Sequence, residues 1–145
     1  MNNVEIAKSY VEEAEKRIRV AEIMLREKSY AFCVRLCQEA VELSLKAALR
    51  LVGIEPPKWH DVGPVLIEFS SRFPSFFKEA IPELAAISRW LRREREPSMY
   101  GDEETGLPPS RLYTEPYAVK ALEEAKIVFN YVKKLLDEYT KAQST

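Results

Sequence analysis

The chain has 145 residues, of which 46% are hydrophobic and 31% are Asp, Glu, Lys or Arg. This length and composition fit a single folded domain over residues 1–145 and exclude a disordered chain. The formal net charge of −1 excludes nucleic-acid binding through bulk positive charge, but not through a local basic patch. No stretch reaches the roughly 20 apolar residues that span a bilayer, and the N-terminus lacks a signal-peptide pattern. The sequence therefore predicts a cytoplasmic protein that contacts no membrane.

Two long helices are predicted at the start of the chain. From about Asn3 to Lys28, apolar residues recur at alternating spacings of three and four, with Asn2 or Asn3 as the N-cap. The second helix is expected from about Tyr30 to Val52, with Gly53 ending it. Its charged and amide residues occupy only ~120° of the helical wheel. We therefore expect it to contact neighbouring helices on at least two sides, and to leave apolar surface for a second protomer.

The middle of the chain predicts shorter elements. A short helix is expected after Asp61, which can cap it, ending near Arg72, and Ser75–Ala80 allows one further turn. Pro82 suits the first turn of a longer helix that is expected to end at about Glu94.

The last third predicts an irregular loop and then a long helix. Residues Ser98–Tyr113 contain two glycines and two prolines without a sustained period, and such long loops are often functional. Thr114 is the expected cap of a final helix, whose apolar stripe repeats that of the first and continues to Tyr139. The predicted fold class is all-α, an up-and-down four-helix bundle with an additional short helix.

Two cysteines and four aromatic residues are interpreted as core. Cys33 and Cys37 lie four apart on one helix face, as small buried thiols. A metal site is the alternative, but no further ligand lies near them, so no metal or cofactor is predicted. The aromatic residues at helical spacing are Tyr10, Phe32, Trp90 and Phe129.

Several motifs together resemble a known family, the HEPN domains (higher eukaryotes and prokaryotes nucleotide-binding). The resemblance covers about Ala7 to Leu136 and depends on the order and spacing of the motifs. These are Gln38, Ala40, Glu42 and Leu45-Lys46-Ala47, a turn at Gly53–Pro56, His60-Asp61-Val62, and an Arg…Tyr-Gly-Asp loop before the final helix.

The resemblance implies a bundle of four or five helices that forms a homodimer. Stand-alone HEPN proteins often accompany a minimal nucleotidyltransferase, and some are toxins of toxin–antitoxin pairs. Many are metal-independent ribonucleases with an Arg-x4–6-His motif, in which the arginine and histidine of two protomers promote attack by the RNA 2′-hydroxyl. A homodimer, a nucleotidyltransferase partner, and a nucleotide or RNA ligand are therefore the implied partners.

The sequence departs from that ribonuclease motif. The only histidine is His60, and where Arg-x4-His is expected the chain has Arg95 followed by Tyr100. Tyrosine side chains ordinarily titrate at about pH 10, too high for an effective general base at neutral pH. We therefore expect a binding module. The alternative is a metal-independent ribonuclease or toxin in which His60, Tyr100 or Asp102 replaces the missing histidine.

Arg92, Arg95, Tyr100 and Asp102 form the predicted nucleotide- or RNA-binding site. Guanidinium groups suit bidentate phosphate contacts, and an exposed tyrosine can stack on a base. In the alternative interpretation, the arginines are neutralised by acidic neighbours. Those neighbours are Glu94, Glu96, Asp102, Glu103 and Glu104.

His60 and Lys46 are weaker candidates. His60 with Asp61 is either a proton-transfer couple or a structural hydrogen-bonding pair. Lys46 is either a phosphate ligand or a lysine paired with Glu42, four residues earlier on the same helix.

Overall fold

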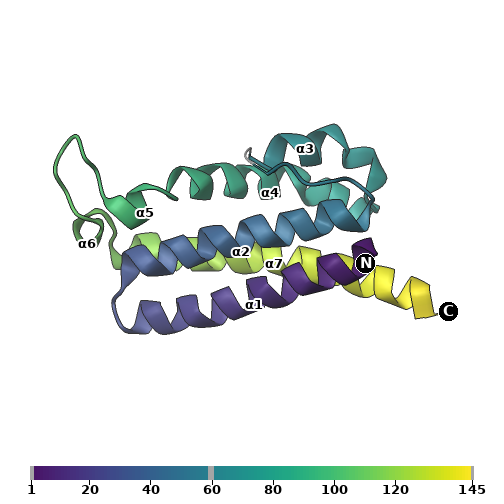
Figure 1. Ribbon diagram of the computed structural model, residues 1–145, viewed down its shortest axis with the longest axis horizontal. Helices are drawn as coiled ribbons and strands as arrows, with labels where there is room; N and C mark the ends of the chain where they lie inside the picture. Colours follow the sequence, from purple (N-terminus) through teal and green to yellow (C-terminus); the bar gives the residue numbers. More distant parts are fainter. Residues whose placement is uncertain (1, 59–60, 145) are drawn as a thin grey trace.

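Four long helices form the molecule, which a computed structural model describes over residues 2–58 and 61–144. They are α1 (Asn3–Arg26), α2 (Tyr30–Leu51), α4 (Ser75–Arg93) and α7 (Glu115–Ser144). They run alternately up and down, which confirms the predicted all-α bundle (Figure 1). Helices α1, α2 and α7 pack on one another, and α4 lies against α2 and α7.

Short elements connect the long helices. The helix α3 (Gly63–Glu68) and the 3₁₀ turn η1 (Ser70–Arg72) lie between α2 and α4, where a short helix was expected. The expected cap was wrong by one residue, because Val62 is the N-cap of α3 and its side chain forms no capping bond. Asp61 instead accepts a hydrogen bond from the backbone N–H of Gly63 at 3.1 Å in the turn that leads into the helix. The predicted irregular loop is partly ordered instead. It contains α5 (Pro97–Tyr100), α6 (Pro109–Leu112) and an antiparallel bridge between residues 102 and 107.

Helix α2 is the centre of the core, as its narrow polar stripe predicts. It contacts α1, α4, α5, α6 and α7. Cys33 and Cys37 are free thiols, both fully buried, as expected. A hydrogen bond with Cys33, together with burial, raises the pKa of the Cys37 thiol. Cys37 is therefore protonated and unreactive at neutral pH.

Both long N-terminal helices end in a left-handed residue. Helix α1 ends at Arg26, earlier than predicted, because Lys28 has φ 62° and the N–H of Ser29 donates to Met24 O at 2.8 Å. Helix α2 ends as predicted, with Gly53 at φ 80° and the N–H of Ile54 donating to Leu49 O at 2.9 Å. Both are Schellman motifs, but a lysine rather than the usual glycine occupies the first.

The predicted start of the fourth helix was wrong. Pro82 lies inside α4, which begins at Ser75, instead of in its first turn. A proline in a helix interior removes one hydrogen bond. Phe77, Ala80 and Ile81 are buried just before the proline, and Leu84 just after it. Burial of apolar side chains on both sides stabilises the helix enough to offset the lost bond.

Phe32 was predicted to lie in the core, but it is 40% exposed. It lies in the first turn of α2. Most other apolar residues of α2 are buried within the chain, whereas Tyr30, Ala31 and Leu43 are partly exposed. In the part of the chain that the structure describes, no helix has the length and hydropathy to cross a bilayer.

Candidate functional site

Glu42 is the anchor of the predicted arginine site. Arg92 Nη1 donates to Glu42 Oε1 at 2.8 Å, and Arg95 Nη1 lies 4.0 Å from Glu42 Oε2. Gln38 Nε2 donates to the same Oε2 at 3.5 Å. The side chains of Glu42 and Arg92 are only 19% and 28% exposed, so this pair is sheltered from solvent. Arg92 and Arg95 are therefore both paired with a carboxylate of α2, fifty residues or more before them in the chain.

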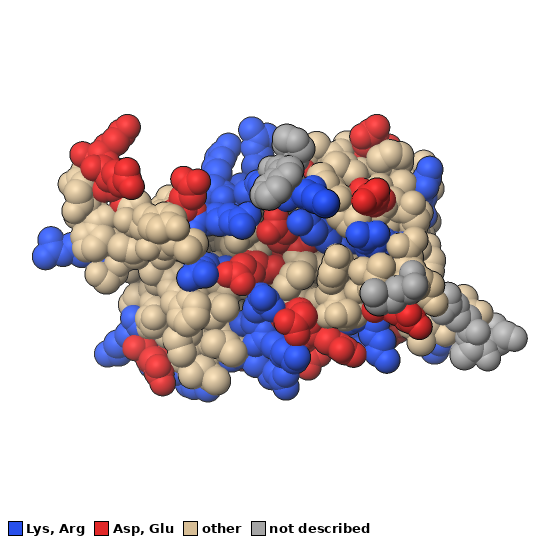
Figure 2. Space-filling view, viewed as in Figure 1, with Lys and Arg blue, Asp and Glu red and all other residues tan. Residues whose placement is uncertain are grey.

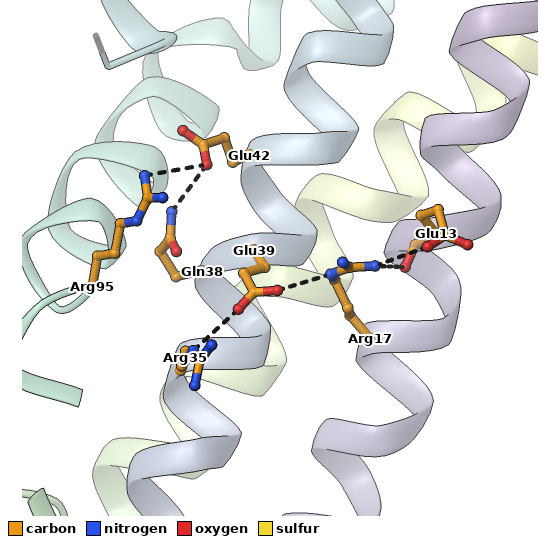
Figure 3. A network of polar contacts seen from close by, with 7 residues as sticks. All are labelled: Glu13, Arg17, Arg35, Gln38, Glu39, Glu42 and Arg95. Carbon is orange, nitrogen blue, oxygen red and sulfur yellow. Dashed lines mark hydrogen bonds and ion pairs between the residues drawn. The ribbon is translucent and has the colours of Figure 1, made fainter. Parts of the chain in front are cut away.

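A second set of ion pairs continues this network towards α1. Glu39 accepts from Arg17 Nε at 3.0 Å and lies 3.3 Å from Arg35 Nε, and Arg17 also pairs with Glu13 at 3.3 Å (Figure 3). The polar residues of α2 therefore link α1 on one side to the segment after α4 on the other.

A basic hollow lies beside α5. It has a volume of about 750 Å³. Its lining residues are Arg92, Arg93, Arg95, Glu96, Pro97, Met99 and Tyr100. Arg93 is exposed, the Arg95 side chain is 56% exposed, and Tyr100 is 66% exposed. Figure 2 shows basic side chains gathered over the end of α4 nearest α5. Three of the four predicted site residues therefore lie at one hollow, and Arg93 joins them.

An acidic hollow of about 480 Å³ lies on the other side of α5. Pro97, Glu96 and Tyr100 line both hollows, so α5 forms a ridge between them. Five carboxylates line the acidic hollow: Glu94, Glu96, Asp102, Glu103 and Glu104. Acidic side chains project at this end of the molecule, in the loop between α5 and α6 (Figure 2). Asp102, the fourth predicted site residue, is therefore separated from the arginines.

Asp102 builds its own loop. Its backbone N–H donates to Leu107 O at 2.8 Å, and its Oδ1 accepts from the backbone N–H of Glu104 at 3.0 Å. Gly101 precedes it with φ 80°, and a Cβ at that position would collide with the carbonyl oxygen of Leu107. Asp102 therefore shapes the loop through its backbone N–H and through one of its two carboxylate oxygens.

Two tyrosines, Tyr113 and Tyr117, also line the acidic hollow. Tyr113 is buried, and its hydroxyl donates to Glu94 Oε2 at 2.7 Å. Burial, followed by the hydrogen bond to Glu94, raises the pKa of Tyr113 far above its usual value, and the same two causes raise the pKa of Tyr117. The two rings pack edge to face with centroids 5.2 Å apart. Glu94, which follows the end of α4, is therefore fastened to the segment that leads into α7.

The weaker candidates lie elsewhere. Lys46 is half-buried on α2, and among the described residues it forms no ion pair, so the predicted pairing with Glu42 was wrong. Glu42 is bound by Arg92 instead, because α4 packs against that side of α2. His60 lies outside the described residues. Its neighbour Asp61 accepts a hydrogen bond from Ser88 Oγ at 2.8 Å, which fastens the segment before α3 to α4.

Comparison with known proteins agrees with this fold and this arrangement of helices. The sequence profile of the HEPN domain matches residues 7–135. The chain belongs to the HEPN domain family. The match confirms the resemblance that the motifs indicated.

This HEPN protein is similar to several relatives along most of its length. It is 28% identical over 142 residues to a Methanocaldococcus jannaschii protein named "Putative toxin MJ1304", covering 94% of this chain and 91% of that protein. It also resembles the crystal structure of TT1696 from Thermus thermophilus, with 26% sequence identity and a TM-score of 0.70. That similarity covers 92% of this chain and 98% of that chain. ST0689, an archaeal HEPN homologue, has a similar fold with 22% identity and a TM-score of 0.68, covering 90% and 97% of the two chains.

Proposed function

We propose that this HEPN protein is a binding module that holds the phosphate groups of a nucleotide or RNA in the basic hollow and works as a homodimer. The observation that carries the proposal is the convergence of Arg92, Arg93 and Arg95 on one hollow beside an exposed tyrosine. Its volume of about 750 Å³ is within the range of small-molecule sites.

Each side chain of the hollow has a separate role in this proposal. Arg92 is oriented by its bond to Glu42 at 2.8 Å, which leaves it little rotational freedom to lose on binding. Arg95 is held loosely by the same carboxylate, so it can turn towards a phosphate. Tyr100 offers a ring face on which a base can stack. A protein partner, a minimal nucleotidyltransferase, is also proposed, on the HEPN resemblance alone.

The test is the binding of a short fluorescent single-stranded RNA, and of ATP, by anisotropy and calorimetry. Arg93→Ala and Arg95→Ala each remove a charged contact, which is expected to weaken binding roughly tenfold. Arg19→Ala, which removes an exposed arginine from α1, is the control for net charge and is expected to bind as the wild type does. Unchanged binding by a folded Arg93→Ala, Arg95→Ala double variant would disprove the site.

A ribonuclease or toxin is the second candidate. Two observations favour it: the name of the Methanocaldococcus jannaschii relative, and the position of Arg95 and Tyr100 on one hollow. Purified protein incubated with RNA in EDTA distinguishes the two candidates. Cleavage that is lost in both Arg95→Ala and Tyr100→Phe would establish the enzyme, whereas RNA that is bound but intact supports the binding module.

A further inference from the structure

A third hollow, the small hollow, lies between α2 and the segment that follows α4. It has a volume of about 200 Å³. Its lining residues are Arg35, Gln38, Glu39, Glu42, Arg95 and Met99. Figure 3 shows five of these six side chains, four from one face of α2 and Arg95 from the segment opposite. Pockets for drug-sized ligands are usually larger, at about 300–1,000 Å³. The small hollow therefore suits a single ring system and not a whole nucleotide.

The small hollow differs in charge from the basic hollow beside it. Two arginines and two glutamates line the small hollow, whereas three arginines and one glutamate line the basic hollow. The basic hollow therefore favours a phosphate, and the small hollow favours a neutral group that has both hydrogen-bond donors and acceptors. Arg95 and Met99 line both hollows, so the two adjoin. One nucleotide of an RNA can thus place its phosphate in the basic hollow and its base in the small one.

Gln38 offers an unused acceptor to such a base. Its side chain lines the small hollow, and the residue is only 3% exposed. The Nε2 atom of Gln38 donates to Glu42 Oε2 at 3.5 Å, whereas its Oε1 atom accepts no hydrogen bond from the described residues. Because protein encloses most of this side chain, a donor on a ligand in the hollow would complete its hydrogen bonding.

The pair formed by Glu39 and Arg35 places acceptors beside donors. Glu39 Oε1 accepts from Arg17 Nε at 3.0 Å, and Glu39 Oε2 lies 3.3 Å from Arg35 Nε. A carboxylate has about four acceptor positions, so each oxygen of Glu39 can accept one more hydrogen bond. Arg35 uses its Nε in this pair, and its two terminal nitrogens remain to donate.

Guanine is the base that matches this order of groups. Its Watson–Crick edge has two neighbouring donors, N2–H and N1–H, followed by the acceptor O6. The same edge of adenine, cytosine or uracil has only one donor nitrogen. A carboxylate with two open acceptor positions beside a guanidinium therefore favours guanine over the other three bases.

We propose that the small hollow receives a guanine base of the bound RNA. The inference rests on the proposed function, because it names the base whose phosphate the basic hollow holds. Glu39 accepts from N1–H and from one N2–H, Arg35 donates to O6, and Gln38 Oε1 accepts from the second N2–H. Met99 gives the ring an apolar contact, and Arg95 reaches the phosphate from the edge that the two hollows share.

Fluorescence anisotropy with the full chain tests the choice of base. The probes are labelled hexauridine and the same RNA with guanosine, adenosine, cytidine or inosine at one internal position. Guanosine is expected to bind about tenfold more tightly than uridine, as a good bidentate base contact allows, and adenosine and cytidine are expected to bind as uridine does. Inosine lacks the N2 amine, so it is expected to bind roughly threefold more weakly than guanosine. This comparison uses the wild-type protein, so it does not depend on the folding of a variant.

Glu39→Gln and Glu13→Gln are a matched pair of variants. Each removes a carboxylate that pairs with Arg17, but only Glu39 lines the small hollow. Glu39→Gln leaves one acceptor atom in place of two, so the preference for guanosine over uridine is expected to fall roughly fivefold. Glu13→Gln is expected to keep the wild-type preference. Circular dichroism establishes that both variants are folded.

Three results would overturn the inference. They are equal binding of the guanosine and uridine probes, inosine that binds as tightly as guanosine, and a folded Glu39→Gln variant with the full preference. Probes that bind through Arg95 without any base preference overturn the base alone, whereas no binding by any probe overturns the proposed function as well. Competition by GMP and AMP separates the sources of the base. Stronger competition by GMP shows that a free guanine nucleotide also enters the hollow, and competition by neither, with guanosine-dependent probe binding, assigns the hollow to RNA.

Discussion

At the scale of single residues, the two left-handed helix ends offer a matched test of backbone strain. Lys28 and Gly53 occupy the same position of the same motif, with φ 62° and 80°. A side chain is unfavourable in this conformation, so Lys28→Gly is expected to increase the free energy of unfolding by roughly 0.5–1 kcal/mol. Gly53→Ala is expected to lower it by about 1 kcal/mol, through strain alone, because a Cβ there meets no atom within 4 Å.

Urea denaturation at neutral pH measures both changes. Opposite signs for the two variants are the decisive result. If Lys28→Gly destabilises the protein, contacts of the lysine side chain outweigh the backbone strain.

The arginine site shows what the sequence could and could not predict at this scale. Arg92, Arg95 and Tyr100 were found because they cluster within a few residues near a proline. Their anchor, Glu42, precedes Arg92 by 50 residues, so nothing in the local pattern joined them. The available indication was the polar stripe of α2, since a carboxylate on a mostly buried helix needs a cation from elsewhere. Asp102 lines the acidic hollow and not the basic one, which local sequence could not show because the course of this loop depends on the backbone conformation of Gly101.

At the scale of elements, the contact between the segment just before α7 and the end of α4 predicts a dependence of stability on pH. The pKa of Tyr113 is raised in the folded protein, so the native state retains a proton that the unfolded chain loses at about pH 10. The stabilisation is therefore fully present below that pH and is lost as the pH rises above it. Tyr117 contributes in the same direction.

Tyr113→Phe tests this contact. The variant is expected to lose about 1 kcal/mol of stability at pH 8, because the hydrogen bond to Glu94 is removed. It is also expected to show a shallower decline between about pH 9 and 11 than the wild type. Urea denaturation at several pH values measures both. Parallel pH profiles of the two proteins would show that the Tyr113 hydroxyl does not contribute.

The helices themselves were predictable where their apolar pattern was long. The stripes of α1 and α7 fixed those helices to within a few residues. The start of α4 was mispredicted because the preference of proline for the first turn of a helix is a local property. The burial of Phe77 and Ile81, which extends α4 before Pro82, depends instead on the helices against which they pack. Four-residue elements such as α5 and α6 are too short to carry a periodic pattern.

At the scale of the whole molecule, the net charge is −1, so any attraction of RNA must come from a local basic patch. The dependence of RNA binding on salt concentration measures how many phosphates that patch contacts. If three arginines contact phosphates, the logarithm of the RNA association constant should fall with the logarithm of salt concentration with a slope of about −2. Arg95→Ala should make that slope shallower by roughly 0.7. Anisotropy titrations at several salt concentrations measure both slopes. A slope near zero would mean that the ligand is not held by its phosphates.

The ridge formed by α5 gives this end of the molecule a local electric dipole. Positive charge lies on one flank and negative charge on the other, with the four residues of α5 between them. A polyanion that diffuses towards this end is repelled from one flank and drawn to the other before any contact is made. The polyanion therefore meets the molecule mostly on its basic side. The arrangement is expected to raise the association rate and to set the orientation of the ligand, in addition to strengthening its binding.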